Sequence, residues 1–252
     1  MTATKSRFRR VEHVMGLPVS VDIRDTDLGD AVLDGFDWLR DVDRRFSPFR
    51  TYSEANRYDR GEIVEPSRDL RAVLAIAEEY ERSSGGAFRA RLPGRGLDLC
   101  GIVKGWAVQR FAEGLRAAGG MNFCVNAGGD VITAGEPEPG RRWLVGIRHP
   151  LLADRMCATL AVGDRAIATS GTYERGGHIT DGRTGRPAAE LLSLTVVAAD
   201  LTVADATATA AFAMGVAGIA WADAQPGCLV FAVTAEGLVQ RSMGLDELLD
   251  QA

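Results

Sequence analysis

The stretch 204-ADATATAAFAMGVAG-218 is so rich in alanine and other apolar residues that it predicts a buried core helix, over residues 205–215. A helix that is apolar on all sides has to be enclosed by other parts of the chain. This segment nevertheless carries a carboxylate, Asp205, and two hydroxyls, Thr207 and Thr209. These polar groups in a core helix require an explanation.

Asp205 and Thr209 lie four residues apart, which places them on one face of such a helix, a single turn apart. Carboxylate and hydroxyl oxygens are hard ligands that suit Mg²⁺, which usually keeps waters and substrate phosphates in its remaining positions. The alternative is structural, because Asp is a favoured N-cap that contributes about 1 kcal/mol, and Thr can bond back to its own helix. Spacing alone leaves both interpretations open.

The segments around this helix predict a mixture of strands and helices. Strand patterns occupy 17–24, 122–127, 143–150, 157–163, 165–171, 192–199 and 228–235. Helical patterns occupy 27–46, 67–86 and 101–120, with a short helix near 244–250. Because strict βαβ alternation is missing, the sequence predicts an α+β fold, with mixed or antiparallel sheets, covering helices and room for two lobes.

Composition describes an ordinary globular protein, with 252 residues, 46% apolar and 25% charged. The formal net charge of −5 argues against a protein that binds nucleic acid by neutralising phosphates. The basic run 5-KSRFRR-10 is too short to change that conclusion. We expect residues 1–12 to form a flexible N-terminal arm before one domain, residues 13–252.

Cysteine usage and the N-terminus indicate the compartment. The four cysteines are irregularly spaced without a CxxC pair, which indicates neither a zinc site nor a disulfide framework. The positive N-terminal residues are followed by no apolar run, and no window reaches the roughly 18 apolar residues of a membrane span. The sequence therefore predicts a cytoplasmic protein without a membrane anchor.

A second polar cluster lies in 168-ATSGTYERGGHITDGRTGRPA-188, where His178 and Asp181 stand beside Arg183 among several glycines. Such residues on one loop suit phosphate binding and proton movement. An ordinary glycine-rich hairpin, with Arg183 paired to a surface acid, accounts for the same pattern.

Two further motifs carry candidate chemistry. In 98-DLCGIVKGW-106, Asp98 and Lys104 bracket a glycine at the start of a helix, where free backbone amides suit an anion. The alternative is that Asp98 caps the helix and Lys104 is solvated. In 126-NAGGD-130, the paired glycines permit positive φ, for a tight turn or a close approach to a ligand.

Several established motifs are missing from the sequence. It contains neither GxGxxG nor the Walker pattern, no GxSxG elbow and no HExxH. With three histidines in the chain, a multi-histidine metal site is disfavoured. These absences leave one kind of site in agreement with the sequence, a site that binds phosphate with the help of a hard cation.

Together these four stretches, in this order, resemble the ApbE family of FAD:protein FMN transferases. The resemblance spans most of the chain, since further matches occur at 14-VMGLPVSV-21, 46-FSPFRTYSE-54, 84-SGGAF-88 and 143-WLVGIRHP-150. It implies an enzyme that binds FAD and Mg²⁺, transfers the FMN moiety to a Thr or Ser of a target flavoprotein, and releases AMP.

The resemblance also implies roles for particular residues. Asp205 and Thr209 would be metal ligands, joined by backbone oxygens near Gly101 and Ala208. His178 would lie nearest the reacting phosphate. That His178 or Asp181 acts as the base is a separate hypothesis, made because an attacking alcohol needs a base within hydrogen-bond reach. Residues implied to line FAD are Met15, Phe49, Ala87, Phe88, Asp98, Lys104 and Ile179, with Phe49 placed to stack on a ring.

The chain departs from the family pattern at several positions. The usual GAFD reads 86-GAFR-89 here, and Gly182 replaces the proline expected after Asp181. The span from Phe88 to Asp98 is also short. These departures motivate two alternatives, an FAD pyrophosphatase that gives FMN and AMP, and an FAD-binding protein without transferase activity.

Overall fold

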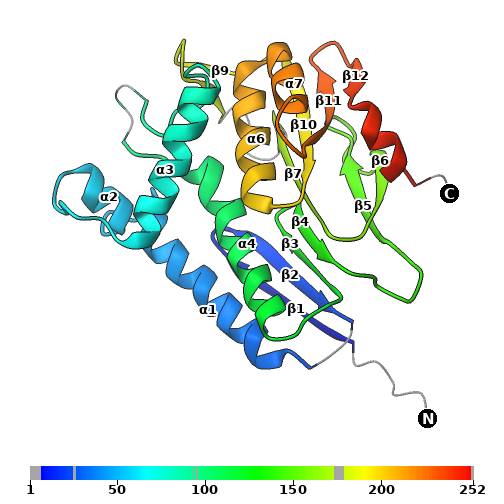
Figure 1. Cartoon of the computed structure of the whole chain (residues 1–252). Helices are drawn as coiled ribbons and strands as arrows, with labels where there is room; N and C mark the ends of the chain where they lie inside the picture. Colours follow the sequence, from blue (N-terminus) through cyan, green and yellow to red (C-terminus); the bar gives the residue numbers. More distant parts are fainter. Residues whose placement is uncertain (1–6, 25–26, 93, 95, 173–178, 251–252) are drawn as a thin grey trace.

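An eight-stranded antiparallel sheet organises the fold in the computed structural model, which describes residues 7–24, 27–92, 94, 96–172 and 179–250 (Figure 1). Every neighbouring pair in this sheet is antiparallel, which confirms the predicted fold class. In spatial order its strands are β1 (Phe8–Val14), β2 (Leu17–Ile23), β3 (Phe123–Ala127), β4 (Asp130–Ala134), β7 (Arg165–Gly171), β10 (Leu191–Ala198), β11 (Leu229–Thr234) and β12 (Val239–Arg241).

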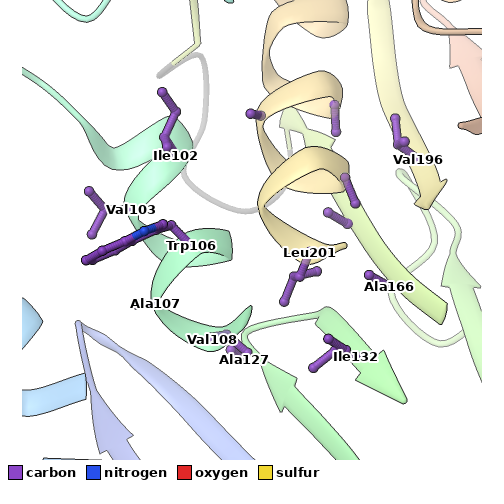
Figure 2. Close-up of a cluster of buried hydrophobic side chains, with 14 of the residues drawn as sticks. Ile102, Val103, Trp106, Ala107, Val108, Ala127, Ile132, Ala166, Val196 and Leu201 are labelled. Carbon is purple, nitrogen blue, oxygen red and sulfur yellow. The ribbon is translucent and has the colours of Figure 1, made fainter. Parts of the chain in front are cut away.

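Helices cover one face of this sheet. Within the described residues, α4 (Cys100–Ala117) and α6 (Leu201–Met214) lie side by side across it. Around them are α1 (Gly29–Phe46), α2 (Glu54–Asp59), α3 (Arg68–Ser83) and α7 (Val216–Asp223). Figure 2 shows part of the core they enclose, with Leu201 of α6 on the side of the strand residues Ile132 and Ala166. Trp106 of α4 points the other way, and its ring packs against Trp38 and Phe46 of α1.

A separate hairpin covers part of the opposite face. Its strands are β5 (Trp143–Arg148) and β6 (Met156–Val162). Trp143 and Leu160 of this hairpin pack in a second apolar cluster with Ile167, Val197 and Phe231 of the large sheet. The central strands are therefore buried on both faces, which explains why β10 and β11 are almost continuously apolar.

The predicted strands are all found, with bounds that agree to within a residue or two. Smaller elements complete the described chain, namely the short pair β8 (Thr180–Asp181) and β9 (Arg186–Pro187), and a 3-10 helix at Met243–Leu248 where a short C-terminal helix was expected. No helix of the described part of the chain combines the length and apolarity needed to cross a membrane.

The first strand corrects the predicted N-terminal arm. Residues 8–12, expected to be flexible, belong to β1 and pair with β2 through a tight hairpin at Met15 and Gly16. Both turn residues have positive φ, of 58° and 74°, as the favoured two-residue hairpin turns require. The strand was missed because its inward face carries Arg10 and Glu12, which hide the alternation of period two.

The start of α6 corrects the interpretation of Asp205. The helix begins four residues earlier than predicted, at Leu201, and its N-cap is Asp200, whose Oδ1 accepts a hydrogen bond from Val203 N at 3.0 Å. Asp205 lies in the second turn and is 4% exposed. The capping interpretation of Asp205 is therefore wrong, and its carboxylate is buried for another reason.

Replacing Asp200 with alanine should lower the free energy of unfolding by about 1 kcal/mol, because Val203 N loses its acceptor. Urea denaturation followed by circular dichroism measures this loss, and Asp200→Ser should restore most of it. An alanine variant as stable as the parent would show that the cap contributes nothing.

Close contact between α4 and α6 depends on glycine. A Cβ added to Gly105 would lie 2.6 Å from both Asp205 Cβ and the carbonyl oxygen of Leu201. One turn earlier, a Cβ on Gly101 would lie 2.9 Å from Thr209 Cγ2. Because Gly101 and Gly105 have no side chain, α4 can approach the polar face of α6 closely.

We expect Gly105→Ala to destabilise the protein by about 2 kcal/mol, because the added methyl group meets backbone that cannot move aside. Gly114→Ala on the same helix is the matched control, since a Cβ there meets nothing within 4 Å. This control should stabilise the protein by about 0.5–1 kcal/mol through helix propensity. Equal effects of the two substitutions in urea denaturation would contradict the close-packing argument.

Candidate functional site

A cavity of about 960 Å³ opens between the helical layer and the end of β7. Its volume is in the range of small-molecule and cofactor sites. Its walls come from the β1–β2 turn, the α1–α2 connection, the segment before α4, and the facing sides of α4 and α6. Of the residues predicted to form the site, those that line this cavity are Met15, Phe49, Phe88, Asp98, Gly101, Lys104, Ile179, Asp205 and Thr209.

Lys104 and Asp205 form the charged end of the cavity, and the buried carboxylate of Asp130 lies behind them. Lys104 Nζ lies 2.7 Å from Asp130 Oδ2 and 3.7 Å from Asp205 Oδ1. Asp130 is fully buried, and Asp205 Oδ2 accepts a hydrogen bond from Gly105 N at 2.8 Å. The side chain of Lys104 is 19% exposed, so the interpretation of Lys104 as a solvated residue is wrong. The lysine offsets part of the cost of burying two negative charges.

Oxygen atoms from two elements meet beside these charges. The Oγ1 of Thr209 lies 3.3 Å from the Oγ of Ser170, which is near the end of β7. Asp205 stands one turn before Thr209 on the same helix, and Gly101 contacts Thr209 from α4. Ala208 is fully buried and does not line the cavity.

These donors fit a hard divalent cation such as Mg²⁺, which prefers carboxylate, hydroxyl and carbonyl oxygens. The described residues contain no group of three or more His, Cys, Asp or Glu side chains that could hold a metal alone. A cation at Asp205 and Thr209 would therefore take its other ligands from backbone, water or substrate oxygens, as Mg²⁺ commonly does.

Apolar side chains form the other walls of the cavity. Phe88 is 6% exposed, and its backbone N donates to Ser84 Oγ at 3.0 Å, which fixes the start of this segment. Ile179 and Met15 are also cavity-lining apolar residues. Ala87 is fully buried and lies behind the lining, where its carbonyl accepts from Gly182 N at 2.8 Å.

Phe49 lies at the mouth of the cavity and is 86% exposed. Its loop is held by Asn56, whose Nδ2 donates to the carbonyl oxygens of Pro48 at 3.0 Å and Arg50 at 2.9 Å. Asn56 belongs to α2, a short helix that is not among the elements predicted from the sequence. A large aromatic ring is thus presented to solvent on a braced loop.

Asp98 lines the cavity, as the family resemblance implied. It is not the N-cap of α4, because that position belongs to Leu99, so the capping interpretation of Asp98 is wrong. From one residue before the N-cap, the Oδ1 of Asp98 accepts a hydrogen bond from Cys100 N at 2.9 Å and supports the first turn of the helix.

Of the two residues predicted to act as the base, His178 and Asp181, the structure describes Asp181. His178 and the tip at residues 173–175 lie outside the described residues, so the role of His178 stays a prediction. Asp181 does not line the cavity, and its Oδ1 accepts from Arg183 N and Nε, both at 2.9 Å. The Arg183 guanidinium holds the pKa of the Asp181 carboxyl below its usual range. This geometry argues against Asp181 as a base and agrees with the hairpin alternative, in which Arg183 pairs with an acid.

Asp130 and Ser170 belong to the site but were not predicted from the sequence. The motif 126-NAGGD-130 is a two-residue hairpin between β3 and β4, with φ of 60° and 102° at Gly128 and Gly129. Its turn function was anticipated, but the residue that follows the glycines is the buried partner of Lys104. An aspartate at the start of an otherwise apolar strand was the available signal.

The fold and cavity together define an α+β protein with a cofactor-sized cavity beside a lysine and a cluster of acidic and hydroxyl oxygens. The model of the ApbE family matches residues 89–231, more than half of the chain. The chain therefore belongs to the ApbE family, which confirms the resemblance found in the sequence.

Similar curated proteins carry one name, FAD:protein FMN transferase. The protein of that name from Klebsiella pneumoniae (strain 342) is 33% identical over 170 residues, which cover 62% of this chain and 52% of the relative. Its counterpart from Vibrio cholerae is 33% identical over 167 residues, with 62% and 50% covered. The chain thus spans about half the length of the curated relatives it matches.

Solved structures agree with this fold over nearly the whole chain. The flavin transferase ApbE from Vibrio cholerae superposes with a TM-score of 0.83 at 23% identity and covers 97% of this chain and 100% of its own. The ApbE protein from Thermotoga maritima gives a TM-score of 0.86 at 22% identity, with 98% and 100% covered. At these identities the comparison shows the fold.

Proposed function

We propose that this protein transfers the FMN moiety of FAD to a Thr or Ser hydroxyl of another protein and releases AMP. The observation that carries this proposal is the joint placement of Lys104, Asp205 and Thr209 on one wall of a cofactor-sized cavity. The name shared by the curated relatives supports the same reaction.

The cavity offers suitable surfaces for both parts of FAD. Phe88, Met15 and Ile179 present apolar surface to a flat ring system, and Phe49 is placed to stack at the mouth. Lys104, which lines the cavity from α4, suits the negative charge of the pyrophosphate.

Mg²⁺ would be held by Asp205 and Thr209, with backbone oxygen near Gly101; Ala208, which the family resemblance also implied, is fully buried and does not line the cavity. When bound, it supplies charge neutralisation for the pyrophosphate oxygens. Ser170 Oγ, which approaches Thr209, is a further oxygen available to this group.

The proposed reaction exchanges the phosphoanhydride bond of FAD for a phosphate ester bond to the acceptor. The acceptor hydroxyl oxygen attacks the phosphorus on the FMN side of FAD, and the bond to the bridging oxygen breaks, so that AMP leaves with that oxygen. The hydroxyl proton passes to a base, for which His178 stays the predicted residue. Lys104 offsets charge on the phosphate oxygens during transfer, because catalysis of this kind depends on positioning and charge stabilisation.

The test uses the protein with FAD and Mg²⁺, with and without an unflavinylated flavoprotein that offers an acceptor threonine. A transferase releases AMP only when the acceptor is present and leaves a fluorescent acceptor band on a denaturing gel. AMP with free FMN in both samples would identify a pyrophosphatase instead. Bound FAD without AMP in either sample would identify a binding protein and contradict the proposal.

A further inference from the structure

Arg89 places a guanidinium on the wall of the cavity. It follows Phe88 directly and lines the same space, with its side chain 38% exposed. Its Nε lies 3.3 Å from Glu81 Oε1, and the Glu81 side chain is 44% exposed. Ion pairs as exposed as this one contribute about 0–1 kcal/mol, so a stronger anionic partner can replace the glutamate.

Two glycines hold the Arg89 side chain. A Cβ added to Gly182 would lie 2.7 Å from Arg89 Cγ and 2.9 Å from Arg89 Cδ. On the other side, a Cβ on Gly86 would lie 3.3 Å from an Arg89 guanidinium nitrogen. The stem of Arg89 therefore fills the space that a side chain at position 182 would need.

The backbone fixes this arrangement. Gly182 N donates to the carbonyl oxygen of Ala87 at 2.8 Å, which joins the segment of Arg89 to the turn after Thr180. A Cβ on Gly182 would also lie 2.6 Å from the carbonyl oxygen of Gly86, so neither segment can move aside without breaking a contact. Any residue other than glycine at 182 has to displace the arginine stem.

The charges around the cavity distinguish Arg89 from the other cations that line it. Lys104 faces two buried carboxylates, and Arg50 pairs with Asp43 at the mouth. Arg89 shares a half-exposed pair with one carboxylate. A guanidinium also presents several N–H donors in a planar fork, which matches the oxygens of a phosphate group.

We propose that Arg89 is a specificity-determining residue that binds a phosphate oxygen of the dinucleotide in the cavity, and that Gly182 is the residue that positions it. This inference rests on the proposed function for the identity of the ligand, FAD. It predicts that the two positions act as a unit, because Gly182 affects the ligand through Arg89.

The experiment is a titration of FAD into the protein in the presence of Mg²⁺, followed by flavin fluorescence at low and high salt. Arg89→Ala should weaken FAD binding about tenfold at low salt and flatten its salt dependence, since one charge-assisted contact is lost. Gly182→Ala should have a similar effect because it displaces the guanidinium. The double variant should bind FAD no more weakly than Arg89→Ala, which is the signature of coupled positions.

Arg82→Ala is the matched control, because Arg82 is an exposed arginine of α3 that pairs with Glu79 and does not line the cavity. It should leave FAD affinity within about twofold, as expected for an exposed ion pair. Circular dichroism confirms that each variant is folded.

Unchanged FAD affinity in Arg89→Ala at both salt concentrations would overturn the inference, as would additive losses in the double variant. These results leave the proposed function intact, because the parent protein still binds FAD. Failure of the parent itself to bind FAD would contradict the proposed function, and with it this inference.

Discussion

Replacing Asp205 with asparagine is expected to reduce AMP release from FAD by about 100-fold or more, while the protein stays folded. Asparagine keeps the shape of the side chain and an oxygen that can accept from Gly105 N, so the contact between α4 and α6 survives. It removes the negative charge that would hold Mg²⁺ beside Thr209. A folded variant that has lost activity would therefore show that the negative charge of Asp205 is needed to hold the cation.

The matched control is Asp200→Asn, the same chemical change on the same helix. Asp200 is the N-cap and lies outside the cavity, and asparagine caps a helix as well as aspartate does. This variant should keep its activity to within about twofold, since it alters neither the cavity nor the cap. An Asp205→Asn variant with full Mg²⁺-dependent activity would remove Asp205 from the metal site.

Lys104→Met is expected to lower the free energy of unfolding by about 3 kcal/mol, because it leaves the fully buried carboxylate of Asp130 without its ion-pair partner. Methionine retains most of the length of the lysine stem, so the loss reports mainly on charge. Asp205 loses a neighbouring positive charge in the same variant, at a distance of 3.7 Å.

The double variant Lys104→Met/Asp130→Asn separates charge from packing. With the second charge removed as well, most of the lost stability should return, because an uncharged buried amide is far less costly than an unpaired carboxylate. Urea denaturation of the parent, both single variants and the double variant closes the cycle. A Lys104→Met protein as stable as the parent would show that the ion pair does not support the fold.

Regular elements of this fold are readable from the sequence. The helix α1 and the strands β7 and β10 were predicted almost to the residue, because their apolar patterns match one periodicity and are bounded by turn residues. The start of α6 was misplaced since both Asp200 and Asp205 are possible caps. Tertiary contact decides between them, because Gly105 approaches Asp205 from another helix.

The sequence identified several residues of the site but not the contacts between them. Lys104 and Asp205 were both singled out, but nothing local indicates that a lysine in α4 reaches Asp130 in β4. Likewise, Ser170 approaches Thr209 only because β7 lies beneath α6. Such contacts join residues far apart in sequence, so they follow from the topology of the sheet and not from spacing along the chain.

The most direct test of the proposed site is a crystal structure of the protein with FAD and Mn²⁺ in place of Mg²⁺, with anomalous data that locate the metal. We expect FAD in the cavity lined by Phe88 and Lys104, and a single strong anomalous peak within coordination distance of Asp205 and Thr209. FAD bound elsewhere, or a metal that contacts neither residue while FAD fills the cavity, would contradict the proposed site.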